Sequence, residues 1–319
     1  MPVHASTGEP IVLRGLDGTN PLAFLAALGT LRALTLGRPE LGVRMCWSRH
    51  AAWNPCLLFE CEQPAEDQLA ELLHQSLTGR ESSPEFNAIG QDLTVEPAVF
   101  RDFARSAAKE ATPKARTTAD FAAAYGCDAL TTEVSGGRII QDTALRTMSG
   151  TGHQHFLAFV RNIIMATTAS HIAKSLFRLW QYNDPVQNLT LRFDPIDDVR
   201  YALQWRDPSG DPRRKTTGSM LGANRLAIEG LPLLATAPCG TRLGTTGFRG
   251  YRSKGTHWTW PIWERPIGLD VVRTLLTDAR LQQTPLPRSE LLHLGVCEVF
   301  RSQRLTIEKW RNFTVGSPA

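Results

Sequence analysis

The chain has 319 residues, of which 42% are hydrophobic and 21% are charged. This composition excludes an intrinsically disordered protein, and the length permits either one large domain or two packed domains. No apolar run approaches the roughly 18 residues that a membrane span requires, and residues 1–10 lack the basic start and apolar stretch of a signal peptide. We therefore expect a cytoplasmic protein with no membrane partner.

The six cysteines are scattered along the chain and form no CxxC pair. Cys56 and Cys61 are close in sequence, but they lack the second pair that a zinc site needs. We therefore expect reduced structural thiols, no metal and no cofactor.

The net charge of +4 is unevenly distributed. Residues 1–137 hold 11 Lys and Arg against 17 Asp and Glu, whereas residues 138–319 hold 24 against 14. Most of the basic residues are arginine, whose planar guanidinium suits bidentate contacts with phosphate. A GC-rich genome would explain the excess of arginine over lysine, but not the difference between the two parts. The distribution predicts a surface for nucleic-acid backbone in the second part.

The first predicted elements are a strand at residues 11–15 and a long helix after it. Asn20 is a good helix cap, and Pro21 fits the first helical position. Five leucines then recur at helical spacing until Gly37, where the helix should end. We expect this helix to face the core.

The remaining pattern indicates an α+β protein, with a helical core, mixed or antiparallel sheet segments and two packed subdomains. Periodicity predicts helices at residues 64–77, 96–111, 118–125, 153–180 (a helix pair), 220–230 and 269–278. Strands are predicted at 43–47, 57–61, 189–193, 201–205 and 258–262. A composition shift at Gly136 and Gly137 suggests a hinge between two subdomains. Residues 1–137 are predicted to form an acidic N-terminal α/β subdomain, and residues 138–319 a basic nucleic-acid-binding subdomain with a helical core and a strand-rich part.

Residues 240–260 combine cations, glycines and aromatic rings without an acidic residue. Glycines let a backbone approach a phosphate closely, cations neutralise it, and aromatic faces stack on bases. We therefore predict a nucleic-acid-binding loop that uses Arg242, Arg249, Tyr251, Arg252 and Lys254. In the alternative interpretation this is a solvated loop whose aromatic residues are buried in the core, above all Trp258 and Trp260.

Two further basic segments extend this predicted surface. One lies in a loop rich in Pro, Gly and Thr and holds Arg213, Arg214 and Lys215, which nearby aspartates could equally neutralise. The other is C-terminal and adds Arg301, Arg304 and Arg311. If this segment is one strand, Arg301 and Arg311 share a face and Arg304 points to the opposite face.

A weaker pattern points to catalysis. His153 and His155 follow a glycine-containing turn and could act as acid and base of a nuclease. They are two positions apart, which does not match a helical metal pair, and a capped helix start explains the same residues. Asp194, Asp197 and Asp198 form an acidic cluster, for which a turn with local pairing is the simpler interpretation. We predict no catalytic residue and no metal site.

Five stretches together are typical of one family: LRGLDGTNPLAFLAALGTLRAL at residues 13–34, MSGTGHQHFLAFVRN at 148–162, LRFDPIDDVRYALQWRDPS at 191–209, GANRLAIEGLPLL at 222–234, and TTGF with TWPIW within 245–263. They resemble subunits of bacterial CRISPR effector complexes of subtype I-G, formerly called I-U, in particular the large-subunit-like proteins. A length of 319 residues is short for a complete large subunit and implies a reduced form or a companion subunit.

The resemblance implies a non-catalytic subunit of an RNA-guided antiviral complex, in which base pairing reads the sequence and protein contacts hold the backbone. The expected partners are CRISPR RNA, target DNA, or both, and the other subunits of the complex. Two alternatives remain. One is a guide-RNA processing endoribonuclease or another nuclease of the same system, and the other is an interaction module whose acidic N-terminal part binds a basic partner.

Overall fold

The computed structural model describes residues 9–49, 51–148, 155–184, 189–196, 218–250, 255–307 and 310–319, without the side chains of 306, 307 and 310. Over these residues the chain forms ten α-helices and four antiparallel sheets, so the predicted α+β class is confirmed. The helices are α1 (Pro21–Gly37), α2 (Glu66–Leu77), α3 (Pro84–Asn87), α4 (Pro97–Glu110), α5 (Thr117–Tyr125), α6 (Phe156–Ala166), α7 (Ala169–Phe177), α10 (Leu221–Gly230), α11 (Leu269–Leu276) and α12 (Arg288–His293).

Short 3-10 turns include η2 (Arg80–Ser82) and η5 (Ala279–Gln282). The strands of the N-terminal sheet, in the order β1-β3-β2, are β1 (Ile11–Val12), β2 (Arg44–Arg49) and β3 (Trp53–Leu58). The larger sheet has the order β11-β10-β9-β8, with β12 beside β10, and consists of β8 (Phe248–Gly250), β9 (Thr256–Trp263), β10 (Val296–Ile307), β11 (Trp310–Phe313) and β12 (Ser317–Pro318). Two hairpins complete the strands: β4 (Thr131–Val134) with β5 (Gly137–Ile140), and β6 (Thr236–Cys239) with β7 (Arg242–Thr245).

Helix α1 forms where the sequence predicts it. Asn20 Oδ1 accepts hydrogen bonds from two backbone N–H groups of the first turn. Every side chain from 21 to 34 is buried, so α1 is a central helix. It packs so closely against α10 that a Cβ atom on Gly29 would lie 1.7 Å from the Leu226 carbonyl oxygen. The close approach of the two helices therefore requires glycine at this position.

One aromatic cluster joins α1 to both sheets. Phe24 of α1 stacks on Trp47 of β2, with ring centroids 5.7 Å apart. The same ring lies 5.9 Å from Trp258 and 5.5 Å from Trp260, both on β9. Rings at these separations bury a large apolar area, so the cluster fixes both sheets against α1.

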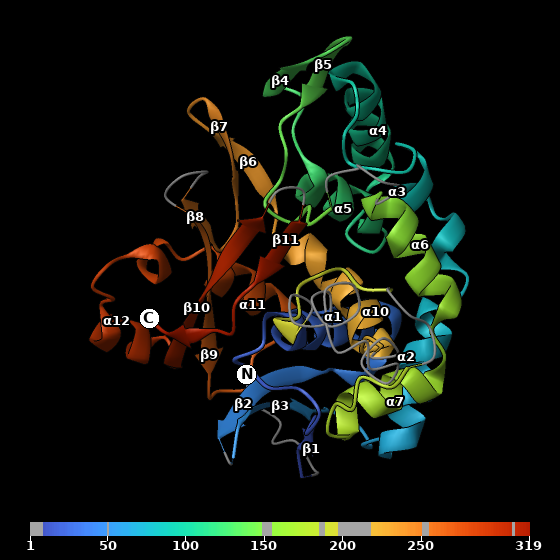
Figure 1. Cartoon of the computed structure of the whole chain (residues 1–319). Helices are drawn as coiled ribbons and strands as arrows, with labels where there is room; N and C mark the ends of the chain where they lie inside the picture. Colours follow the sequence, from blue (N-terminus) through green and yellow to red (C-terminus); the bar gives the residue numbers. More distant parts are fainter. Residues whose placement is uncertain are drawn as a thin grey trace, which may run out of the picture.

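Figure 1 shows α1 and α10 at the centre, with the N-terminal sheet below them and the strands of the larger sheet to the left. Helices α2, α6 and α7 lie on the right, and the hairpins β4–β5 and β6–β7 project upward. A single hydrophobic core contains described residues from both sides of Gly137. Gly136 and Gly137 themselves lie at the tip of the β4–β5 hairpin. Two packed subdomains are therefore not confirmed, and the boundary between residues 137 and 138 stays a prediction.

The strand predicted at residues 189–193 is wrong. Arg192 has a φ of 62°, which is incompatible with an extended strand. Instead, the backbone N–H of Leu191 donates to Asn224 Oδ1 at 2.8 Å, so α10 holds this segment by a side chain. The strand predicted at 201–205 lies outside the described residues.

Most other predicted elements match the structure closely. Helices α6 and α7 confirm the predicted helix pair and meet at an angle of 98°. The helices predicted at 64–77, 96–111, 118–125, 220–230 and 269–278 are confirmed to within two residues at either end. The strand predicted at 57–61 is displaced toward the N-terminus: the observed strand, β3, spans Trp53–Leu58. Among the described residues no single helix combines the length and apolar character of a membrane span.

Candidate nucleic-acid interface

Three aromatic residues within 240–260, namely Phe248, Trp258 and Trp260, lie on the inner face of the larger sheet. Trp258 is opposite Phe248 on β8 and Ser302 on β10, and Trp260 is two positions further along β9. Both tryptophans are fully buried, and Phe248 stacks on Trp258 with ring centroids 5.4 Å apart. Trp258 and Trp260 are therefore core residues, as the alternative interpretation predicts, and they are not available to stack on bases.

Arg249 and Arg301 lie on the opposite, outer face of the sheet. Arg249 is opposite His257 on β9, and Arg301 is opposite Thr259 two positions along the same strand. Because alternate residues of a strand share a face, both arginines project from the same side. Gln303 on β10 is also opposite His257 and continues the row. We call Arg249 and Arg301 the outer arginine pair.

Neither guanidinium of the outer arginine pair has a carboxylate partner among the described residues. Arg301 Nε donates to Thr259 Oγ1 at 3.1 Å, and its Nη1 donates to Thr284 Oγ1 at 3.4 Å. Arg249 Nη1 donates to the Gln282 carbonyl at 2.5 Å. Partial burial, and then the charge of Arg249, lower the pKa of Arg301 from its usual value. Two like charges are thus held near each other by neutral groups.

The side chains of His257 and Gln303 meet beside Gly255. A Cβ atom on Gly255 would lie 3.0 Å from Gln303 Nε2 and 3.5 Å from His257 Nε2. Gly255 also has a φ of 75°, a conformation that favours glycine. An amide and an imidazole therefore extend the row of hydrogen-bonding groups along the outer face.

Arg304 and Arg311 lie together on the inner face, which corrects the prediction that Arg311 shares a face with Arg301. The chain reverses between β10 and β11, so that Arg304 is opposite Phe313. Arg311 is two positions from Phe313 and therefore projects from the same face as Arg304. The prediction treated residues 301–311 as one continuous strand. Because the chain reverses after β10, Arg311 lies on the face opposite to the one expected.

Both inner arginines hold the segment at residues 142–146. Arg304 Nη1 donates to the Ala144 carbonyl at 2.8 Å, and Arg311 Nη1 donates to the Arg146 carbonyl at 2.7 Å. Arg311 also forms an ion pair with Asp142. Burial, and then the charge of Arg311, lower the pKa of Arg304 to about 10. These contacts give both side chains a structural task in joining β10 and β11 to this segment.

His155 lies directly before α6, with its Nδ1 atom 3.9 Å from Asp92 Oδ2. Arg146 already binds the Asp92 carboxylate in a bidentate manner, with distances of 3.0 and 2.8 Å. A carboxylate paired in this way is a weak partner for a general base. The geometry at His155 therefore does not build a catalytic dyad with Asp92.

The remaining predicted residues are dispersed. Arg242 is exposed on β7. Asp194 is buried and accepts hydrogen bonds from Asn20 Nδ2 at 3.1 Å and from the Ile196 N–H at 3.2 Å, which agrees with a locally bonded turn. The predictions that fall outside the described residues concern His153, Asp197, Asp198, Arg213, Arg214, Lys215, Tyr251, Arg252 and Lys254.

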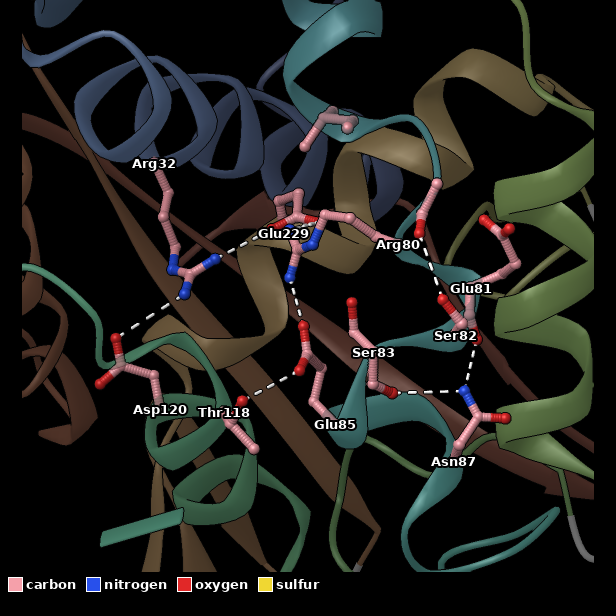
Figure 2. Close-up of polar contacts among 12 residues, drawn as sticks. Arg32, Arg80, Glu81, Ser82, Ser83, Glu85, Asn87, Thr118, Asp120 and Glu229 are labelled. Carbon is pink, nitrogen blue, oxygen red and sulfur yellow. Dashed lines mark hydrogen bonds and ion pairs between the residues drawn. The ribbon is translucent and has the colours of Figure 1, made fainter. Parts of the chain in front are cut away.

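Sequence reasoning missed a buried ion network, and Figure 2 shows its Arg32, Arg80 and Glu229 side chains. Glu229 of α10 lies 2.9 Å from Arg32 of α1, 2.6 Å from Arg80 of η2 and 3.0 Å from Arg225 of α10. Arg80 also pairs with Glu85 at 2.6 Å. Burial raises the pKa of Glu229, but the three positive charges outweigh it and lower the pKa to about 2. The signal in the sequence was Arg32, the only charged residue of α1.

Within the described ranges, no group of three or more His, Cys, Asp or Glu side chains is placed to hold a metal ion. The six cysteines are free thiols.

Comparison of the chain with protein-family models, curated proteins and solved structures gave no match. The outer face of the larger sheet is therefore the feature from which a function can be inferred.

Proposed function

We propose that this protein is a non-catalytic, nucleic-acid-binding subunit of an RNA-guided CRISPR effector complex in the cytoplasm. The family resemblance of the sequence motivates the choice of system, and the outer arginine pair motivates the chemistry. The ligand is the phosphate backbone of guide RNA, of target DNA, or of both. The further partners are the other subunits of the complex.

The outer arginine pair is the observation that supports backbone binding most strongly. Arg249 and Arg301 contact only neutral acceptors among the described residues, so neither charge is compensated there. Each guanidinium has five N–H donors and uses at most two of them in these contacts. A phosphate beside the pair would offset their repulsion and accept hydrogen bonds from both.

This surface suits backbone contacts better than base recognition. The groups on it are guanidinium, imidazole and amide side chains, whereas Trp258 and Trp260 are buried beneath the sheet. Contacts to phosphate position a protein on a nucleic acid and carry no sequence information. That division of labour fits a complex in which a guide RNA reads the sequence.

Replacement of either outer arginine tests the proposal. We expect Arg249→Ala and Arg301→Ala each to weaken the binding of labelled single-stranded RNA or DNA about tenfold at about 50 mM salt, because each removes a charge-assisted contact to phosphate. Fluorescence anisotropy measures the dissociation constants.

Arg105→Ala is the matched control, because Arg105 is exposed on α4 and has no ion pair within the described part of the chain. This variant removes the same charge from another surface and should bind like the unaltered protein. Equal losses in all three variants, or no loss in any, would contradict a specific role for the outer face.

A further inference from the structure

A pocket of about 380 Å³ lies between η2 and α3 on one side and α6 on the other. Glu81 and Asn87 contribute to the first wall, and Arg161, Asn162 and Met165 contribute to the second. This volume is in the range of small-molecule sites. The pocket is separate from the outer arginine pair, since it shares no residue or element with the larger sheet.

Hydrogen bonds fix both walls of this pocket. Asn87 Nδ2 donates to the Glu81 carbonyl at 2.5 Å and closes the turn between η2 and α3. Arg80, the residue before Glu81, is anchored in the buried ion network of Figure 2. Arg161 Nη1 donates to the Phe86 carbonyl, which joins α6 to α3. Side chains on walls held in this way are oriented before a ligand arrives.

The pocket contains a carboxylate and a guanidinium that do not neutralise each other. Glu81 and Arg161 both line it, yet neither forms an ion pair with any residue that the structure describes. Figure 2 shows Glu81 extending away from the buried ion network. The side-chain amide of Asn162 likewise has no hydrogen-bond partner within the described ranges. The pocket therefore offers an acceptor pair on one wall and donors on the other.

We propose that this pocket binds a guanine base. Guanine has adjacent donors, N1–H and N2–H, that match a carboxylate, and the acceptors O6 and N7, which match a guanidinium or an amide. Glu81 accepts from the two donors, and Arg161 and Asn162 donate to the acceptors. Met165, which is 62% exposed, supplies a thioether surface for the ring. Other small molecules also carry both hydrogen-bond donors and acceptors. The choice of a nucleobase among them rests on the proposed nucleic-acid-binding function.

Calorimetric titration with the four ribonucleoside monophosphates and with guanosine tests this assignment on the unaltered protein. We expect GMP and guanosine to bind alike and at least about tenfold more tightly than AMP, CMP or UMP, because a bidentate contact discriminates between bases by about this factor. Glu81→Gln should lose at least about tenfold in GMP affinity. Glu71→Gln, an exposed position of α2 outside the pocket, should lose nothing.

Equal binding of the four nucleotides, no GMP binding at about 1 mM, or displacement of GMP by free glycine would overturn the assignment. The nucleotide comparison needs no variant, so it remains decisive even where Glu81→Gln does not fold. A failure here is also distinguishable from a failure of the proposed function. The double variant Arg249→Ala/Arg301→Ala should keep GMP binding, and Glu81→Gln should keep the binding of RNA backbone at the outer face.

Discussion

Glu229 is a fully buried carboxylate that depends on three arginines. Its oxygens lie within 3.0 Å of guanidinium nitrogens from Arg32, Arg80 and Arg225. Removing one charge from a buried network leaves an excess of the opposite charge in a medium of low dielectric constant, which costs far more than losing a surface pair. The network connects α1, η2 and α10, so its loss affects the centre of the fold.

We expect Glu229→Gln to lower the free energy of unfolding by about 3 to 5 kcal/mol, because the buried Arg32 and Arg225 and the partly buried Arg80 lose their common counter-charge. Urea denaturation measures this change. Asp270→Asn is the control, because Asp270 pairs with Arg273 at 3.5 Å but its side chain is 92% exposed. This variant should change stability by less than about 0.5 kcal/mol.

The stability difference between the unaltered protein and Glu229→Gln should depend on pH. The pKa of Glu229 is lowered from 4.5 to about 2 in the fold, so its contribution is complete above about pH 4.5 and disappears as the pH falls toward 2. The unaltered protein should therefore lose more stability than Glu229→Gln across this window. Parallel stability curves for the two proteins would contradict the role of the ionised carboxylate.

Single residues differ in how far their sequence context reveals them. Arg249 and Arg301 stand out because each lies in a segment poor in acidic residues. The orientation of Arg311 was mispredicted because its face depends on where the chain reverses after β10. The partner of Arg32 lies 197 positions away, and no local pattern encodes a contact over that separation. Glu81 and Arg161 come together for the same non-local reason.

Among the elements, α1 was predictable because its signals are local. The cap at Asn20 and the repeated leucines are all within one helix length. Strand β3 was predicted to begin at residue 57 rather than at Trp53, because a proline such as Pro55 is unfavourable inside a strand. The structure tolerates this proline because it lies opposite the residue that follows β1. The Leu13 N–H donates to the Pro55 carbonyl, and the reciprocal bond is absent because proline has no N–H.

The contact between α1 and α10 depends on Gly29. We expect Gly29→Ala to lower the free energy of unfolding by about 3 kcal/mol, because its Cβ atom would overlap the Leu226 carbonyl oxygen and the two helices would have to separate. Gly268→Ala is the control, since a Cβ atom there would meet nothing within 4 Å. It should cost less than about 1 kcal/mol. Equal midpoints of thermal unfolding for the two variants would contradict tight packing at Gly29.

At the scale of the whole molecule, charge and core are organised differently. The acidic and basic parts of the sequence divide near residue 137, yet α1 from the first part and α10 from the second pack together at the centre. The division of charge along the sequence is therefore not matched by a division of the core. The cause is physical: charge counts add along the chain, whereas a core is built from contacts between residues distant in sequence.

The salt dependence of nucleic-acid binding tests the central claim most directly. We expect the unaltered protein to bind RNA or DNA with an affinity that falls steeply as salt rises, because phosphate contacts release counterions. The double variant Arg249→Ala/Arg301→Ala should reduce the slope of log K against log salt by about 1 to 2, whereas Arg105→Ala should leave it unchanged. An unaltered slope in the double variant, or no binding by the unaltered protein at about 50 mM salt, would contradict the account.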